Sequence, residues 1–423
     1  MSFDEGAAAV RDVAGARWRM AVEGQEDLRE AATRELADVL FASFPRRDQR
    51  RKGELYLLGS LNTPGRKSIR NIAAHMGGSA AEQSMHHFIS SSTWDWKPVR
   101  EALAVYLSRL SPPQAWVVHP MPIPKAGDLS VGVEQVLDPC LGNFRGQRAF
   151  GVWYASASLD TPVSWRLFLP DSWTQDETRR RQAEIPEGAG EETLEECAVE
   201  AVLDVLGSWK VPSRPVVLNT EIGHVTAIMD RFTRAGVPVI ARVTDTARFV
   251  VHDPALPGHA GGQLAAQQIA MAARGLRRRV GLAERSGVAA GSPGTLAVAL
   301  SVEPAGPAAG RRRAGTGDEN GELVLLGEWN GPRGTPDALW VTNMTSMSTG
   351  ALLRMTRLGG RSGHDLAASG ADMGLRDFKS RSFNGWHRHI TLASAAHAVS
   401  ALIEASTRVG TPTRASDYAH RSA

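Results

Sequence analysis

His119 is the residue whose type and setting first point to chemistry. It follows the apolar run Trp116-Val117-Val118, which predicts a short buried strand, and Pro120 after it predicts a turn. The last strand residue before such a turn faces a cleft in many α/β enzymes. Imidazole can act as a general base or bind a metal ion. The position therefore indicates a catalytic residue, a metal ligand, or a replacement for one.

Basic residues form the second chemical feature. Arginine accounts for 42 of the 48 basic residues, although the net charge is only +3. The planar guanidinium of arginine binds phosphate with two hydrogen bonds, so a high arginine content is typical of nucleic-acid binding. GC-rich coding also raises the arginine content, so the positions of the arginines must distinguish the two causes. Between positions 41 and 70, eight basic residues are opposed only by Asp48 and Glu54. DNA contact is favoured over a solvated helix face, because the run is dense and adjoins a helix-turn-helix-like pattern. The eight are Arg46, Arg47, Arg50, Arg51, Lys52, Arg66, Lys67 and Arg70.

The composition is that of a water-soluble globular chain. With 423 residues, 42% hydrophobic and 22% charged, it has the length for two or three domains. The first residues lack a basic region followed by an apolar run, and no stretch reaches 18 apolar residues, so we expect neither a signal peptide nor a membrane span. Cys140 and Cys197 are expected to be reduced, buried thiols in a cytoplasm.

The elements that must position these residues fall into several regions. Residues 1–112 read as an all-helical domain, with helices on either side of the turn at Pro64-Gly65. From 113, the runs "AWVVH", "RAFGVWYASASL" and "PVSWRLFLP" predict antiparallel strands. "RPVVLN", "HVTAIMDRFTRAG" and "VPVIARV" then predict a strand, a helix and a strand, and such a βαβ unit has parallel strands.

The later half is less regular. Residues 245–338 read as a β-rich insertion that carries basic runs at Arg277, Arg278 and Arg279 and at Arg311, Arg312 and Arg313. "LWVTNM" predicts a return to the core at 339–406, followed by helical stretches on both sides of Gly359-Gly360 and a long terminal helix. Residues 407–423 read as a polar, frayed tail. The pattern predicts an α/β fold with one mixed sheet between helices.

Several blocks together resemble bacterial insertion-sequence transposases of the DDE type. "PRRDQRRKGELYLLGSL", "RKSIRNIAAHMGG" and "SSTWDWKPVR" are similar to the helical N-terminal region of that group. "PVSWRLFLPDSW", "LLGEW" and "GLRDFKSRSFNGWHRHITLASAAHA" are similar to its catalytic half, in the same order, over roughly residues 25–405. The resemblance implies a ribonuclease H-like core (a mixed sheet with flanking helices), interrupted by a β-rich insertion and preceded by an all-helical DNA-binding domain.

The resemblance also implies where catalytic acids would stand. Active members hold two divalent metal ions with two Asp and one Glu, and Mg²⁺ requires such carboxylate oxygens to cut a phosphodiester. The matching positions here are His119, Asn219 and Gly363. Two acids lie close in sequence: Glu221 is two residues beyond Asn219, and Asp365 is two residues beyond Gly363. A shift of two residues moves a side chain by about 7 Å along a strand, or turns it by about 200° around a helix. Neither would rebuild a two-metal site, so we expect no metal cofactor and no catalytic residue.

Other constellations at these positions give weaker signals. His119, His224 and His364 would suit Zn²⁺ or Fe²⁺ if they gathered, but no carboxylate spacing supports them. His387 and His389 lie two apart and face different directions on a helix. Gly359-Gly360 lacks the Lys and Ser or Thr of a nucleotide loop.

The sequence thus predicts an inactive, domesticated transposase-like protein that binds double-stranded DNA, as a transcriptional regulator or architectural factor associated with the nucleoid. A homodimer is compatible with this role, because paired DNA sites favour two-fold symmetry. The alternatives are an enzyme or binder of a small molecule in the former cleft, and a decaying product without a role. Further candidate phosphate contacts, after the first eight, are Arg277, Arg278, Arg279, Arg311, Arg312, Arg313, Lys379, Arg381 and Arg388.

Overall fold

The N-terminal part of the chain is helical in the computed structural model, which describes residues 25–138, 141–256, 258, 261–281, 295–305, 321–379 and 381–409. Apolar side chains at helical spacing, such as Leu36 and Leu40, are buried. The elements are α2 (Gln25–Leu40), η1 (Phe41–Ser43), α3 (Arg47–Asn62), α4 (Ile69–Met76), α5 (Ser79–His86), the π-helix η2 (His87–Ser91) and α6 (Trp96–Leu110). Cys140, Arg311 to Arg313 and the tail from residue 410 lie outside the described residues.

The described strands then form one mixed sheet of twelve. Its order is β2-β3-β1-β5-β6-β12-β11-β10-β7-β8, with β4 on β3 and β9 on β10. The first strands are β1 (Ala115–Pro124), β2 (Glu134–Asp138), β3 (Gly142–Ala155), β4 (Asp160–Leu167), β5 (Val216–Ile222) and β6 (Val239–Val243). β1 and β4 are antiparallel to β3, and β1, β5 and β6 are mutually parallel. The predicted antiparallel strands and βαβ unit are confirmed.

The segment predicted as a β-rich insertion continues this same sheet. It contributes β7 (Arg248–Val251), β8 (Gln263–Ala265), β9 (Arg278–Val280), β10 (Thr295–Pro304) and β11 (Leu323–Trp329). β11 pairs with β12 (Ala338–Thr342), and β12 pairs with β6, so backbone hydrogen bonds connect both parts. The segment therefore extends the core sheet at one edge.

β1 differs from the prediction in a way that shapes the site. The expected turn at Pro120 is wrong, because β1 continues to Pro124 and pairs with β3 throughout. Trp116 N donates to the β5 side, at Pro215 O, and Lys125 N donates to the β3 side, at Arg145 O. Since the backbone nitrogens alternate between the two sides, those of Pro120, Pro122 and Pro124 face the β5 side. Proline has no N–H there to donate a hydrogen bond to a neighbouring strand. The pairing of β1 with β5 accordingly ends at Val118, and His119 is the first residue beyond it.

The helices between the strands have local sequence causes. α9 (Leu194–Ser208) begins with a capping box in which Thr193 and Glu196 satisfy each other's backbone N–H. α10 (Val225–Arg234) buries Ile228, Met229 and Phe232 on one face. The shorter elements are α7 (Asp171–Thr174), α8 (Glu177–Gln182), α11 (Ala266–Ala272) and η4 (Ala273–Leu276).

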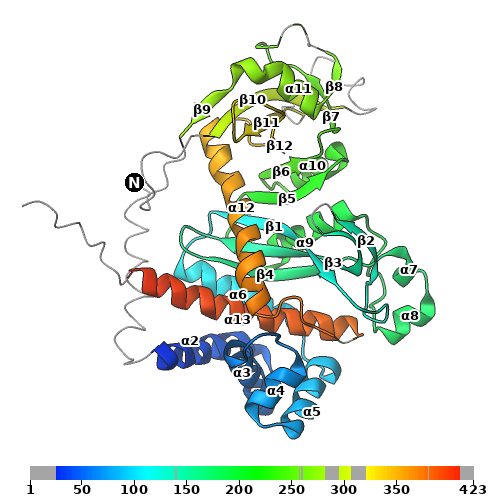
Figure 1. Cartoon of the computed structure of the whole chain (residues 1–423), viewed down its shortest axis with the longest axis vertical. Helices are drawn as coiled ribbons and strands as arrows, with labels where there is room; N and C mark the ends of the chain where they lie inside the picture. The colour runs from blue at the N-terminus through cyan, green and yellow to red at the C-terminus, as the bar shows by residue number, and fades with distance from the viewer. Residues whose placement is uncertain are drawn as a thin grey trace, which may run out of the picture.

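Two long C-terminal helices complete the fold. α12 (Thr349–Asp372) is a single helix through Gly359-Gly360 and crosses the sheet from β10 towards β4 (Figure 1). α13 (Phe383–Val409) lies between the sheet and the helices α2–α5 (Figure 1). It is buried on almost every side between Trp386 and Val399, as expected for a helix covered on two faces.

One hydrophobic core joins the helical region to the sheet. Polar side chains of α13 bond to both neighbours: His389 Nδ1 lies 2.8 Å from the Tyr56 hydroxyl on α3, and Ser394 accepts a hydrogen bond from the indole of Trp165 on β4. The change from helices to strands at residues 112–113 is therefore not a break in packing. Among the described residues, no helix has the length and apolar character needed to cross a membrane.

Candidate functional site

The open end of the β1–β5 pairing and the middle of α12 form the site. His119 is half-buried on β1, and a Cβ added to Gly363 would lie 2.5 Å from its Nε2. Asn219, on β5, donates from Nδ2 to the carbonyl of Gly359 at 3.3 Å. Gly359 is one helical turn before Gly363, so the side chains of Asn219 and His119 face the same stretch of α12. The fold thus brings together the three positions at which the resemblance places acids.

The imidazole of His119 is held in one orientation. Its Nδ1 lies 2.8 Å from the carbonyl oxygen of Pro120, so Nδ1 carries the proton and Nε2 faces Gly363. Burial lowers the pKa of His119, and the nearby positive charge of Arg376 lowers it further, although the bond to Pro120 acts in the opposite direction. His119 is therefore neutral at pH 7.

A buried carboxylate, Asp160, lies beside this site. It begins β4 and accepts hydrogen bonds of 2.8 Å from Arg361 Nε and from Ser362 Oγ on α12. Burial raises its pKa to about 6, against the opposing effect of Arg361. Arg361 also donates to the carbonyl of Ser156, so the group fastens α12 to β4.

The other acids and histidines near the vacated positions are not gathered there. Glu221 is exposed and pairs with Arg242 at 3.0 Å. His224 is exposed at the start of α10, 3.2 Å from Glu195, and His364 is exposed on α12. Within the described part of the chain, no three His, Cys, Asp or Glu side chains are placed to hold a metal ion.

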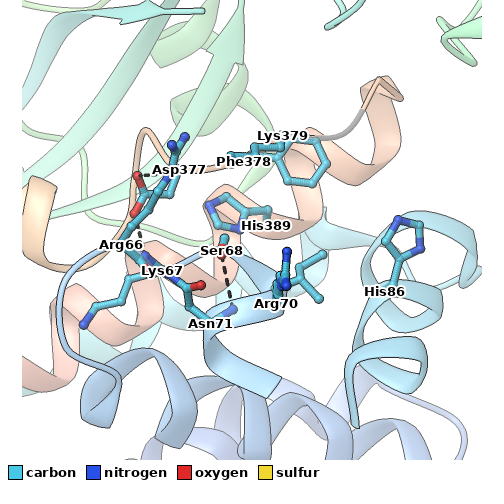
Figure 2. A pocket seen from close by; sticks show the side chains of 11 residues that line it. Arg66, Lys67, Ser68, Arg70, Asn71, His86, Asp377, Phe378, Lys379 and His389 are labelled. Carbon is cyan, nitrogen blue, oxygen red and sulfur yellow. Dashed lines mark hydrogen bonds and ion pairs between the residues drawn. The ribbon is translucent and has the colours of Figure 1, made fainter. Parts of the chain in front are cut away.

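A cavity of about 430 Å³ lies elsewhere, between the start of α4 and the segment after α12 (Figure 2). Arg66, Arg70 and Lys379 surround it, with Phe378 and His389 behind them (Figure 2). The acid among its lining residues is Asp377, which pairs with Arg66 at 3.4 Å. The N-cap Ser68 accepts from Asn71 N, so α4 directs its positive end to the same place. The cavity is suited to an anion.

Most of the predicted phosphate contacts are at the surface. Arg46, Arg47 and Lys52 lie at the start of α3, where Asp48 is within 4 Å of two of them. Lys52 and Arg277 are partly exposed, and Arg277 donates to Arg274 O and Pro332 O and lies over the Trp329 ring. The exposed ones are Arg46, Arg47, Arg50, Arg51, Arg66, Arg70, Arg278, Arg279, Lys379 and Arg381.

Two of the predicted contacts, Lys67 and Arg388, are buried, which argues against DNA contact at these residues. The Lys67 side chain donates to Thr63 O, and its backbone N–H donates to Asp377 at 2.7 Å. Arg388 donates to Trp94 O at 3.0 Å and to Ile89 O at 3.2 Å, and its guanidinium also lies over the Trp94 ring. Both residues fasten the helical region to the segment around α13. Little of either side chain is open to solvent, so we assign them structural roles, although Lys67 also lines the cavity of Figure 2.

The histidines of "GWHRHITL" are likewise structural. His387 stacks on Trp96 with ring centroids 4.8 Å apart, and its Nδ1 accepts from Arg100 at 3.1 Å. His389 lies between the Tyr56 hydroxyl and the carbonyl of Gly374. Burial lowers the pKa of both, to about 4 for His389. They are neutral members of the core.

Sequence reasoning did not identify Asp160 and Arg376. Asp160 precedes the apolar run of β4, and a lone acid at a strand start has no special pattern. Arg376 lies in the short segment "RDFK" between two predicted helices, where basic and acidic residues alternate. No pattern in the sequence distinguishes Arg376 from the other arginines.

Comparison with known proteins assigns the chain to a family. No curated protein matches it. Among solved structures it is similar to the piggyBac transposase in a synaptic complex with hairpin DNA, with 9% identity and a TM-score of 0.38, over 98% of this chain and 75% of that one. A model described as DDE superfamily endonuclease matches residues 39–276, a span that includes His119 and Asn219 and ends before Gly363. Since this match covers more than half of the 423 residues, the chain belongs to the DDE superfamily endonuclease family.

Proposed function

We propose that this protein binds double-stranded DNA without cutting it, and acts by occupying its site as a transcriptional regulator or architectural factor. The observation that carries the proposal is the contact of His119 with the Gly363 position, at 2.5 Å from a Cβ there. Three positions expected to bear acids converge, and they carry an imidazole, an amide and a hydrogen. These contacts support the proposal that the three positions form one site that has lost its acids.

Chemistry explains why this unit would not cleave DNA. Phosphodiester cleavage by two metal ions needs carboxylate oxygens close to both ions. A neutral imidazole and an amide give Mg²⁺ poor ligands, and Gly363 gives none. Asp160 cannot substitute readily, because Arg361 and Ser362 already occupy its oxygens.

Exposed cations support DNA as the partner. Arg70, Arg66 and Lys379 face one cavity, and a second group of arginines lies at the start of α3. DNA binding depends mainly on such phosphate contacts. On this proposal, helices α2–α6 form the DNA-binding region. The order β4-β3-β1-β5-β6, with β1, β5 and β6 parallel, supports a ribonuclease H-like core behind it.

The alternative of a small-molecule site in the former cleft has less support. The cavity of about 430 Å³ is lined by residues of the α4, α5, α13 and 377–379 segments, and by none from β1 or β5. Its cationic lining suits phosphate better than an apolar metabolite.

The test is binding of the purified full chain to genomic DNA fragments at about 0.1 M salt, since phosphate contacts weaken steeply above that. We expect binding that falls with salt, and sedimentation of the complex reports whether a dimer binds. Genome-wide occupancy in the native cell separates a regulator, with discrete peaks, from general binding. No binding to any fragment would contradict the proposal.

A further inference from the structure

Arg376 lies in the segment that connects α12 to α13, and both sides of this segment are fixed. Leu375 N donates to Gly370 O at the end of α12. Beyond Arg376, Asp377 accepts from Lys67 N, and the carbonyl of Phe378 accepts from Lys125 Nζ at 2.6 Å. Lys125 directly follows β1. Arg376 is therefore held near the half of β1 that has no partner on the β5 side.

Arg376 is a partly buried cation for which the described residues show no ion pair with an acid. Its Nε is buried and has no hydrogen-bond partner among the described residues. Two acids of this region are already bonded to other groups: Asp377 to Arg66 and Lys67, and Asp160 to Arg361 and Ser362. Burial lowers the pKa of Arg376, and no acid opposes that effect. Holding a charge in this state costs free energy, and such groups cluster at binding sites.

The vacated centre has no other strong ligand for an anion. His119 uses Nδ1 for Pro120 O, and Asn219 uses Nδ2 for Gly359 O. The positive charge of Arg376 reaches His119 and helps to lower its pKa. Asp377, Phe378 and Lys379, the next three residues, line the cationic cavity of Figure 2. The same short segment thus connects the cavity with the vacated centre.

We propose that Arg376 binds a backbone phosphate of DNA at the vacated centre, where it supplies the positive charge that metal ions supply in active members. This inference rests on the proposed function and names a residue for it. A guanidinium forms two parallel hydrogen bonds to phosphate, so it positions the backbone well. It provides no activated hydroxide and cannot bind a leaving oxygen as a second metal ion would. The strand is held and stays intact.

The test compares Arg376→Gln with Arg354→Gln, which removes an exposed arginine from α12 outside the proposed surface. Binding of the full chain to a duplex is measured by fluorescence anisotropy at several salt concentrations. We expect Arg376→Gln to weaken binding about tenfold and to lower the salt slope by about one, as for one lost phosphate contact. Arg354→Gln should bind like the wild type. Arg376→Lys should recover part of the loss, because it restores charge but not the fork.

A second readout follows His119 by NMR. A phosphate bound to Arg376 would offset the positive charge that lowers the pKa of His119. DNA should therefore raise the pKa of His119 in the wild type but not in Arg376→Gln. Inorganic phosphate is the parallel probe: a shift with it alone, and none with DNA, would overturn DNA as the ligand. If the wild type binds DNA and Arg376→Gln binds with equal affinity and salt slope, the inference fails and the proposed function stands. If the wild type binds no DNA, both fail.

Discussion

The imidazole of His119 occupies the space that a side chain at position 363 would need, with only 2.5 Å between Nε2 and a Cβ built on Gly363. The ring cannot turn away freely, since Nδ1 is bonded to Pro120 O. A histidine on β1 and a glycine on α12 therefore fit each other as a pair. The histidine at one position and the missing side chain at the other are therefore physically linked.

The first prediction concerns this pair. Gly363→Ala should lower the free energy of unfolding by about 1–3 kcal/mol, because the new methyl group overlaps the ring in a packed site. His119→Ala in the same chain should remove most of that loss. Urea unfolding of the two single variants and the double variant measures the coupling.

Gly360→Ala is the matched control, since a Cβ there meets no atom within 4 Å and the residue is exposed on the same helix. It should raise stability by about 0.5–1 kcal/mol, because alanine favours a helix over glycine. Equal effects of the two glycine substitutions would show that His119 does not fill the position.

The second prediction restores the acids. The triple variant His119→Asp, Asn219→Asp, Gly363→Glu should bind Mg²⁺ weakly in calorimetry, and metal binding should return before any DNA cleavage. Gly363→Glu alone should unfold readily instead, because His119 remains in the way. Absence of Mg²⁺ binding by the folded triple variant would mean that the cleft no longer has the geometry of a metal site.

The third prediction separates DNA contacts from structural arginines. Arg70→Ala should reduce the salt slope of DNA binding by about one and leave the unfolding temperature unchanged. Arg388→Ala should lower the free energy of unfolding by about 2–4 kcal/mol, because two buried carbonyl oxygens lose a charged donor. If Arg388→Ala were fully stable and only its DNA binding were impaired, the corrected role of Arg388 would be wrong.

The fourth prediction is a pH dependence of stability. Burial lowers the pKa of His387, His389 and His397, to about 4 for the last two, from an ordinary value of 6.5. The stability that these neutral histidines contribute is complete above pH 6.5 and is lost as the pH falls towards 4. The reason is that histidines of the unfolded chain become protonated at a higher pH than those of the folded chain. Asp160, with its pKa raised to about 6, acts oppositely, since the folded chain takes up its proton first as the pH falls.

The lowered pKa of His119 and the raised pKa of the buried Glu328 act in opposite directions, so three histidines against Asp160 leave about two net protons. The free energy of unfolding should therefore fall by about 2–3 kcal/mol per pH unit near pH 5.5. Urea unfolding at pH 7.0, 6.0 and 5.0 measures this slope. His397→Asn should remove the contribution of about one proton, so the slope should fall by about 1.4 kcal/mol per pH unit. A stability that stays level or increases from pH 6.5 to 5 would contradict the assignment of neutral buried histidines.

The sequence was informative where a residue pattern has a single physical meaning. Apolar runs located β1, β5 and β6, and the helix between β5 and β6 correctly predicted that these two strands are parallel. Proline predicted a turn, but three prolines at alternate positions instead leave the part of β1 beyond Val118 paired on one side only. The helical stretches predicted on both sides of Gly359-Gly360 form one continuous helix, α12, and the glycine at 359 allows Asn219 and Val217 to approach it closely.

The binding surface was harder to predict than the fold. Lys67, Arg388 and Arg70 are equally basic in the sequence, and only packing distinguishes the buried pair from the exposed one. Arg376 looked ordinary, because its distinguishing property is the absence of a partner for its Nε among the described residues. Such properties depend on contacts between distant segments, which one sequence does not display.

The most direct test measures binding and cleavage in one sample. The full chain is mixed with labelled duplex DNA at about 0.1 M salt in Mg²⁺ or Mn²⁺, and complex formation and strand integrity are followed together. The account predicts a salt-sensitive complex in which both strands remain intact. Metal-dependent cleavage by the wild type, absent from a His119→Ala, Asn219→Ala variant, would contradict it.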